Sequence, residues 1–257
     1  MNLPQFHLHA EIEQRHWWFR GRRRIMESLV RRVLSPSREE SVVDIGCGTG
    51  GNISALSDSY SCIGIDRSPE AIRLAQGRFP NIRFIRWSGT GDQDSVHQAK
   101  LFLLMDVLEH LEDDTLFLSE WVAAARPGAH FLITVPADPR LWSPHDVSFG
   151  HYRRYDRKRL EQVWEGLPVT PLLVSYYNST LYPAVRLARI LSRGRGRTTG
   201  VAGTDFFMPP AAINALLEWI FSGEAKVLVD LLEGKRSRGF RKGVSLIALL
   251  HREKDGC

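Results

Sequence analysis

Residues 42–51 read Val42-Val43-Asp44-Ile45-Gly46-Cys47-Gly48-Thr49-Gly50-Gly51. The run 42–45 is apolar apart from its acid and predicts a buried strand, and residues 52–57 predict the start of a helix. Glycines between a strand and a helix let the backbone turn tightly and let a ligand approach without a Cβ in the way. The stretch therefore predicts a ligand-binding turn in an α/β domain.

Strands and helices alternate along the rest of the chain. Beyond 42–45, strands are expected at 62–65, 82–87, 100–105, 131–135, 172–177 and 244–250, the last one antiparallel and at the edge of the sheet. Helices are expected at 69–79, with Ser68 as the N-cap, and at 113–125, ended by Pro127-Gly128. This alternation predicts an α/β fold with a doubly wound, mostly parallel, seven-stranded sheet.

An acid, Asp66, follows the second strand about 20 residues after Gly46, where its carboxylate can accept hydrogen bonds from ribose hydroxyls. Gly46, Gly48 and Gly51 also fit the dinucleotide fingerprint G-x-G-x-x-G, so a nicotinamide or flavin enzyme is an alternative. Asp44 argues against it, because a diphosphate would meet a negative charge there. S-adenosylmethionine has an ammonium and a sulfonium but no phosphate, and an acid suits it.

Four motifs carry a family resemblance: D-I-G-C-G-T-G at 44–50, G-I-D-x-S at 64–68, D-V-L-E-H-L at 106–111 and R-P-G at 126–128. Together they resemble the successive motifs of class I S-adenosylmethionine-dependent methyltransferases, in the group often labelled type 11 or type 12. The resemblance covers about residues 40–136. It implies a Rossmann-like fold, S-adenosylmethionine as the cofactor and methyl transfer as the activity.

The resemblance also implies which residues hold the cofactor. They are Asp44, Gly46, Cys47, Gly48 and Gly50 for the methionine part, Asp66 for the ribose, Met105 and Asp106 near the sulfonium, and Arg67 and His110 beside them. The family often has an acid after the third strand that contacts the adenine amino group. This chain has Trp87-Ser88-Gly89 there, so Trp87 and Ser88 are the adenine-binding candidates.

Asp106, Glu109 and His110 are spaced i, i+3 and i+4, and on a helix they would share one face. Such a face could bind a divalent metal, as the resemblance of this segment to methyltransferases of ubiquinone-type catechols suggests. Alternatively, Glu109 and His110 stabilise the loop under the cofactor by hydrogen bonds. No second acidic cluster completes a six-oxygen shell, so we favour the second interpretation and expect no metal.

The stretch after the fifth strand, where this fold normally builds its acceptor pocket, reads Trp142-Ser143-Pro144-His145-Asp146-Val147-Ser148-Phe149-Gly150-His151-Tyr152-Arg153-Arg154-Tyr155. Methyl transfer needs an aligned nucleophile, and a hydroxyl nucleophile benefits from a general base, usually His. We expect His145 or His151 to be that base, with Asp146 orienting a ring. Arg153, Arg154 and Tyr155 are expected to bind an acceptor with an acidic group. The alternative is a structural loop whose arginines pair with acids and whose histidines cap a helix.

Residues 6–35 predict helix, with Gly21 as a break or cap, and contain His16-Trp17-Trp18-Phe19-Arg20. Trp17 and Trp18 are expected to pack over the cofactor or the acceptor as a lid; the alternative is that they anchor a terminal helix to the core. H-W-W-F-x-x-R-R at 16–23 and G-H-x-R-R-Y at 150–155 resemble a subgroup of these methyltransferases found with natural-product and cell-surface glycan pathways.

The length of 257 residues suits one methyltransferase domain. Its expected parts are an N-terminal helical lid at 1–38, the cofactor-binding core at 40–136, an acceptor-side insertion at 137–165 and a C-terminal helical cap at 178–243. The cap could cover the acceptor pocket, form a homodimer, or rest on a membrane that carries a lipid-linked acceptor.

The cysteine content, the N-terminal sequence and the net charge bear on where the protein works and what it binds. Three scattered cysteines, Cys47, Cys62 and Cys257, give neither a disulfide framework nor zinc spacing, and the N-terminus lacks the pattern of a secretory signal, so a cytoplasmic enzyme is expected. A formal charge of +5 suits an anionic substrate, nucleic acid or a membrane surface and is too small to decide among them. The leading prediction is methylation of an oxygen on an acidic small molecule, with nitrogen open. The alternatives are methylation of tRNA, helped by a mobile basic loop at 193–203, and a non-catalytic scaffold.

Overall fold

The computed structural model describes residues 3–88, 93–193, 200 and 204–253. Seven strands form one sheet in the order β3-β2-β1-β4-β5-β7-β6. They are β1 (Ser37–Ile45), β2 (Tyr60–Asp66), β3 (Arg83–Arg86), β4 (Leu101–Met105), β5 (His130–Pro136), β6 (Val169–Tyr177) and β7 (Ser245–Arg252). The first five are parallel, and β7 is antiparallel to both β5 and β6. The mostly parallel, doubly wound, seven-stranded sheet predicted from the sequence is confirmed.

The position expected for the last strand is wrong, although its antiparallel direction is confirmed. β7 lies between β5 and β6, and the edges of the sheet are β3 and β6. All five residues from Leu246 to Leu250 are buried, because helices cover both faces of the sheet at this point. An unbroken apolar run is what a central strand needs.

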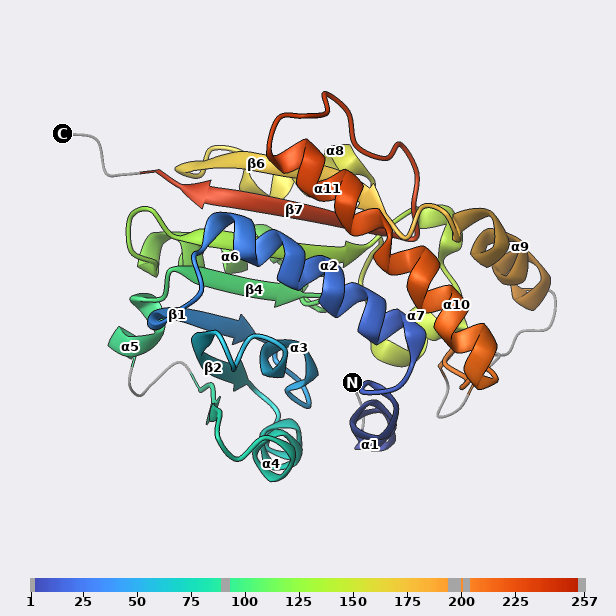
Figure 1. The fold of residues 1–257 in the computed structure, drawn as a ribbon, viewed down its shortest axis with the longest axis horizontal. Coiled ribbons are helices and arrows are strands. Elements are labelled where there is room, and N and C mark those ends of the chain that lie inside the picture. The colour runs from blue at the N-terminus through green and yellow to red at the C-terminus, as the bar shows by residue number, and fades with distance from the viewer. Residues whose placement is uncertain (1–2, 89–92, 194–199, 201–203, 254–257) are drawn as a thin grey trace.

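Two layers of helices enclose the sheet (Figure 1). One core cluster joins the sheet to the helices α2 (Trp17–Val33), α3 (Gly51–Ser54), α4 (Pro69–Arg78), α10 (Ala211–Ser222) and α11 (Glu224–Leu232). The other joins it to α5 (Gln93–His97), α6 (Asp114–Ala124), α8 (Arg157–Glu161) and the 3-10 turn Gln162–Trp164. Ser68 caps α4 as predicted, since its side chain accepts a hydrogen bond from the Ala71 N–H.

Gly21 does not break the N-terminal helix. The break lies at residues 13–16, between α1 (Leu3–Ile12) and α2, where the His16 side chain caps α2 by accepting from the Trp18 N–H. Gly21 is inside α2, and a Cβ there would lie 2.5 Å from Cδ1 of Phe221 on α10. The glycine is explained by close packing of two helices that are distant in the sequence.

The elements that build the site gather at one end of the sheet. The arrowheads of β1 and β4 point toward the end where α7 (Pro144–Phe149), α9 (Tyr182–Arg193) and α10 lie (Figure 1). The acceptor-side insertion holds the 3-10 turn Pro139–Leu141 and, after it, α7. Most of the basic loop expected at 193–203 lies outside the described residues. Among the described helices, none is long and apolar enough to cross a membrane.

Candidate active site

The glycine-rich turn after β1 is held in a conformation that favours glycine. Gly46, Gly48 and Gly50 have φ angles of 71°, 55° and 83°. A Cβ at Gly46 would lie 2.8 Å from Cγ2 of Val107, and one at Gly50 would lie 2.8 Å from Cζ of Phe84. A Cβ at Gly48 would meet nothing within 4 Å. Gly48 is therefore the position where the missing side chain leaves room for a ligand.

Asp66 is fixed beside this turn. Its carboxylate accepts hydrogen bonds from the Gly48 N–H at 2.9 Å and from the Ser68 N–H at 2.8 Å. The acid at the end of β2 is thus aimed at the turn before any ligand arrives. Arg67, the next residue, is exposed.

Trp87 and Ser88, the residues expected to contact adenine, differ in their surroundings. The Trp87 ring packs on Trp121 of α6, with centroids 5.2 Å apart, and its edge contacts His97. Ser88 is exposed. Because Trp87 is half-buried against the core, it has less ring surface for stacking than an exposed tryptophan.

Asp44 lies under the turn and is fully buried. Burial raises the pKa of its carboxyl to about 8, although the nearby Arg22 acts in the opposite direction. An acid predicted to balance the cofactor's positive charge is therefore largely protonated near neutral pH in the ligand-free protein. A cation bound above the turn would favour its ionised form.

A cavity of about 430 Å³ opens at the ends of the strands. Its wall combines segments that are far apart in the chain: the N-terminal helices, the glycine turn, the end of β4, the insertion and α9. Among its residues are Glu13, His16, Trp17, Trp18, Phe19, Arg22, Gly46, Cys47, Gly48, Met105, Asp106, Glu109, His110, His145, Phe149, His151, Arg154, Val185, Ala188, Arg189 and Phe206.

The residues predicted from the sequence divide into two sets. The cavity brings together Gly46, Cys47, Gly48, Met105, Asp106, His110, Trp17, Trp18, His145, His151 and Arg154. Asp44, Gly50, Asp66, Arg67, Trp87, Ser88, Arg153 and Tyr155 are not part of its wall. The first set joins the glycine turn and the expected acceptor side around one cavity.

Arg153 and Tyr155 belong to a separate network. The Tyr155 hydroxyl, fully buried, donates to Oδ2 of Asp114 at 2.7 Å, and Arg153 pairs with the same carboxylate at 3.0 Å. Arg159 completes the cluster around Asp114. For these two residues the structural alternative describes the contacts better than acceptor binding does.

Arg22 and Glu13 line the cavity, although the sequence analysis did not identify them as site residues. The Arg22 guanidinium pairs with Asp106 and lies 4.3 Å from the centre of the Trp18 ring. Glu13 accepts from the Thr49 hydroxyl in the glycine turn at 2.8 Å. The available signal for Arg22 was its position four residues after Trp18, on the same face of the helix.

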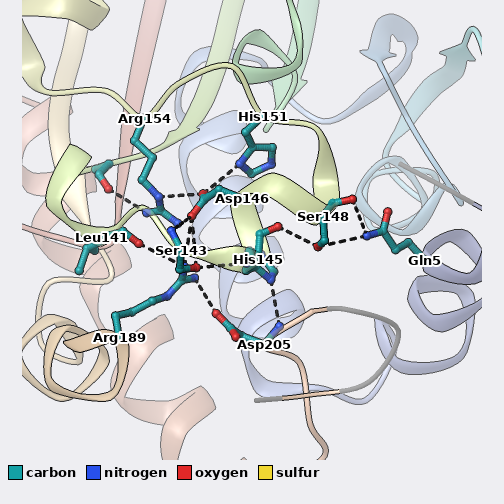
Figure 2. Close-up of polar contacts among 11 residues, drawn as sticks. Gln5, Leu141, Ser143, His145, Asp146, Ser148, His151, Arg154, Arg189 and Asp205 are labelled. Carbon is teal, nitrogen blue, oxygen red and sulfur yellow. Dashed lines mark hydrogen bonds and ion pairs between the residues drawn. The ribbon is translucent and has the colours of Figure 1, made fainter. Parts of the chain in front are cut away.

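Asp146 is the centre of a buried network in the insertion (Figure 2). Its Oδ1 accepts from Nε of Arg154 at 2.8 Å and lies 3.0 Å from Nδ1 of His151. Its Oδ2 accepts from the Ser143 N–H at 2.9 Å and pairs with Arg189 of α9 at 3.3 Å. Although burial alone would raise its pKa, the hydrogen bond to His151 and the two guanidinium groups hold the pKa well below its ordinary value.

The two histidines expected as bases have different environments. Nδ1 of His145 accepts a hydrogen bond from the Asp205 N–H at 2.9 Å, and burial holds the pKa of His145 well below its ordinary value. His151 is oriented by Asp146, and its ring meets that of His110 with centroids 4.7 Å apart. Burial also lowers the pKa of His110 to about 3. His151 is thus the histidine whose orientation a carboxylate fixes.

Comparison with known proteins gives the class of this site. A family model described as a methyltransferase domain matches residues 17–172. Norajmaline N-methyltransferase of Rauvolfia serpentina is 29% identical over 149 residues, which cover 54% of this chain and 50% of that protein. A rice protein named "Probable tocopherol O-methyltransferase, chloroplastic" is 33% identical over 122 residues, covering 43% of this chain and 34% of that protein. The chain thus spans half or less of the length of these relatives.

Solved structures agree on the fold. The plantazolicin methyltransferase BpumL in complex with SAH aligns with a TM-score of 0.56 at 14% identity, covering 97% of this chain and 90% of that one. Figure 1 and the strand order show the corresponding Rossmann-like sheet. With the family model matching more than half of the residues, the chain belongs to the methyltransferase-domain family of class I S-adenosylmethionine-dependent methyltransferases.

Proposed function

We propose that this chain transfers the methyl group of S-adenosylmethionine to an oxygen atom of a small molecule bound in the cavity. The observation that carries the proposal is the set of residues that line one cavity. The glycine turn and Met105 lie at one side of it, and the histidines of the insertion lie at the other. Methyl transfer is an in-line displacement, so a cofactor and a nucleophile must face each other in a space that excludes water. A cavity that joins these two sides supports that arrangement.

The binding of the cofactor is assigned to the turn and its neighbours. Gly48 would leave room for the methionine part, and Asp66 would accept from the ribose hydroxyls. Arg67, Trp87 and Ser88 stay predictions for the remaining contacts. The Arg22–Asp106 pair lines the same cavity and would fix the position of the reacting atoms.

Activation of the acceptor oxygen is assigned to His151 rather than His145. Nδ1 of His145 is already engaged by the backbone of Asp205. His151 binds Asp146 through Nδ1, which leaves Nε2 as the atom that can act on an acceptor. A histidine oriented by a buried carboxylate is the usual arrangement for withdrawing a proton from a hydroxyl.

The lining of the cavity suits a largely apolar acceptor better than an acceptor with an acidic group. Its three arginines, Arg22, Arg154 and Arg189, are each paired with a carboxylate. Aromatic and aliphatic side chains form much of the remaining wall, namely Trp17, Trp18, Phe19, Phe149, Val185, Ala188 and Phe206. We therefore propose a hydroxylated, largely apolar natural-product or glycan-linked intermediate. A homodimer and contact with a membrane stay predictions, and tRNA methylation gains no support from the described residues.

The test is to incubate the purified chain with S-adenosylmethionine and a panel of phenols, other alcohols, carboxylic acids and amines. We expect mass spectrometry to show one added methyl group on hydroxyl compounds, with turnover lost in His151→Ala and retained in His145→Ala. Unchanged turnover in both variants would remove the histidine from the proposal. Methylated amines alone would change the acceptor class, and binding of NAD in place of S-adenosylmethionine would refute the function.

A further inference from the structure

Three potential ligand groups meet on the acceptor side of the cavity. Glu109 and His110 belong to the 3-10 turn Leu108–His110 that follows β4, and His151 belongs to the insertion. One carboxylate oxygen and one nitrogen from each ring lie within 4.8 Å of one another. The Tyr152 N–H donates to the Glu109 carbonyl at 2.7 Å, so the backbone itself holds the two segments together. The cluster is thus a built part of the fold.

Glu109 is an unusual member of this wall. Its side chain is 1% exposed, yet its Oε2 has no hydrogen-bond partner among the described residues. A buried polar atom without a partner destabilises the folded state, and a charged one does so more strongly. A cation held at this atom would offset that destabilisation.

Both histidines are arranged as metal ligands usually are. Nδ1 of His151 is bound to Oδ1 of Asp146, which leaves Nε2 with a lone pair for an ion (Figure 2). The backbone of Phe149 and Gly150 offers hydrogen-bond partners to the His110 ring. Metal-ligating histidines typically donate their second N–H to a carboxylate or a backbone carbonyl in this way.

We propose that Glu109, His110 and His151 bind a divalent transition-metal ion such as Zn²⁺ or Mn²⁺, with open coordination positions facing the acceptor. Two imidazoles and one carboxylate suit these ions better than Mg²⁺ or Ca²⁺, which prefer oxygen. From the sequence, Asp106, Glu109 and His110 were the candidate metal ligands, and no metal was expected. In the structure Asp106 pairs with Arg22, and His151, 41 residues after His110, completes the set instead.

This inference rests on the proposed function and defines how His151 acts in it. The acceptor oxygen would bind the ion, which lowers the pKa of its hydroxyl, and the proton would leave to solvent. The oxygen then forms the new bond to the methyl carbon. The carbon–sulfur bond breaks with its electron pair going to sulfur, so the cationic sulfonium becomes the neutral thioether of S-adenosylhomocysteine. With the ion bound, the Nε2 of His151 would hold the metal, so the ion would replace His151 as the group that activates the hydroxyl.

The first experiment is calorimetric titration of the full chain, freed of metal by a chelator, with Zn²⁺, Mn²⁺ and Mg²⁺. We expect one site for Zn²⁺ and Mn²⁺, with weaker binding of Mg²⁺. Glu109→Gln and His110→Gln should each weaken that binding by roughly 10–100-fold or more. Substituting a residue that only hydrogen-bonds to a metal ligand already causes a loss of this size. The control is the double variant His130→Gln/His251→Gln, since those rings form another close pair, with centroids 4.8 Å apart.

The control must retain the site, and circular dichroism must show that every variant is folded. If the variants do not fold, the electron paramagnetic resonance of Mn²⁺ on the wild-type chain replaces them, and a spectrum without nitrogen ligands overturns the inference. Binding that is absent, or that disappears in the His130/His251 control, also overturns it. Turnover that persists in chelator while S-adenosylhomocysteine still binds would leave the proposed function standing and refute the metal site alone.

Discussion

The cofactor side and the acceptor side of the cavity are built by different means. The proposed cofactor side depends mainly on one stretch, residues 44–68, and the geometry of that stretch lies in the backbone: three glycines with positive φ and N–H groups that hold Asp66. The acceptor side joins the insertion, α9 and the segment around Asp205 through buried ion pairs (Figure 2).

Each side also contains a buried carboxyl, and the two are in opposite states. Burial raises the pKa of Asp44, for which the described part of the chain provides no ion pair, whereas His151 and two arginines lower that of Asp146. The comparison shows that burial alone does not decide the charge of an acid; the cations that the fold brings to it do. It also implies that the two sides should respond differently to substitution.

Asp146→Ala should have the largest effect, because it leaves Arg154 and Arg189 buried without their shared carboxylate. Breaking a buried charge network in this way costs about 3–5 kcal/mol of the free energy of unfolding. Urea denaturation would measure it. As a control, Glu161→Ala breaks the exposed Arg157–Glu161 pair and should cost less than about 1 kcal/mol. Equal losses in the two variants would contradict a special role for the buried network.

Asp66→Ala should act mainly on cofactor binding, although it also removes the acceptor of the Gly48 and Ser68 N–H groups. The ribose hydroxyls would lose two hydrogen bonds to a charged carboxylate, each worth about 1.5 kcal/mol. This loss predicts roughly 100-fold weaker binding of S-adenosylhomocysteine. Calorimetric titration would measure it. Asp58→Ala removes an exposed acid just before the opposite end of β2 and should bind as the wild type does. If both variants bind equally well, Asp66 does not contact the cofactor.

Gly48→Ala should separate backbone strain from ligand contact. The positive φ costs about 1–2 kcal/mol with a Cβ present, but the added methyl meets no protein atom within 4 Å. We expect that modest loss of stability together with weaker cofactor binding. Gly77→Ala, in α4 and also without nearby atoms, should instead stabilise the protein by up to about 1 kcal/mol. Normal cofactor affinity in Gly48→Ala would show that the ligand does not approach this turn.

Much of the fold could be predicted because it depends on local patterns. The alternation of strands and helices, the glycine turn and the Ser68 cap each need only neighbouring residues, and each was confirmed. The place of β7 was not local, since the neighbours of a strand are set by pairing across the sheet. Gly21 was misinterpreted for the same reason, because its explanation is Phe221, 200 residues away.

The candidate site shows the same division. Glu109 and His110 are adjacent in the chain, so the sequence alone indicated that they lie together. It could not reveal that His151 lies in the same cluster. Nor could it assign Arg22 to Asp106, because the chain between them must first fold. Contacts between residues that are distant in the sequence form only when the elements pack together. The acceptor side consists largely of side chains that meet in this way.

Asp44→Asn should give the smallest change, and its sign depends on pH. Above its ordinary pKa of 3.8 the carboxyl is ionised in the unfolded chain, but in the folded protein it stays protonated up to about pH 8. The folded state therefore binds the extra proton, and the free energy of unfolding falls as pH rises through this window. Asparagine cannot ionise and removes that dependence.

Relative to the wild type, Asp44→Asn should therefore gain about 1 kcal/mol of stability between pH 7 and pH 8, as measured by urea denaturation at the two values. Asp58→Asn, at an exposed acid, should show no such gain. A difference that is independent of pH would mean that Asp44 is already ionised at neutral pH, like Asp146, and the contrast between the two buried acids would fail. A gain that disappears when S-adenosylmethionine is present would instead show that the bound cation supplies to Asp44 what the arginines supply to Asp146.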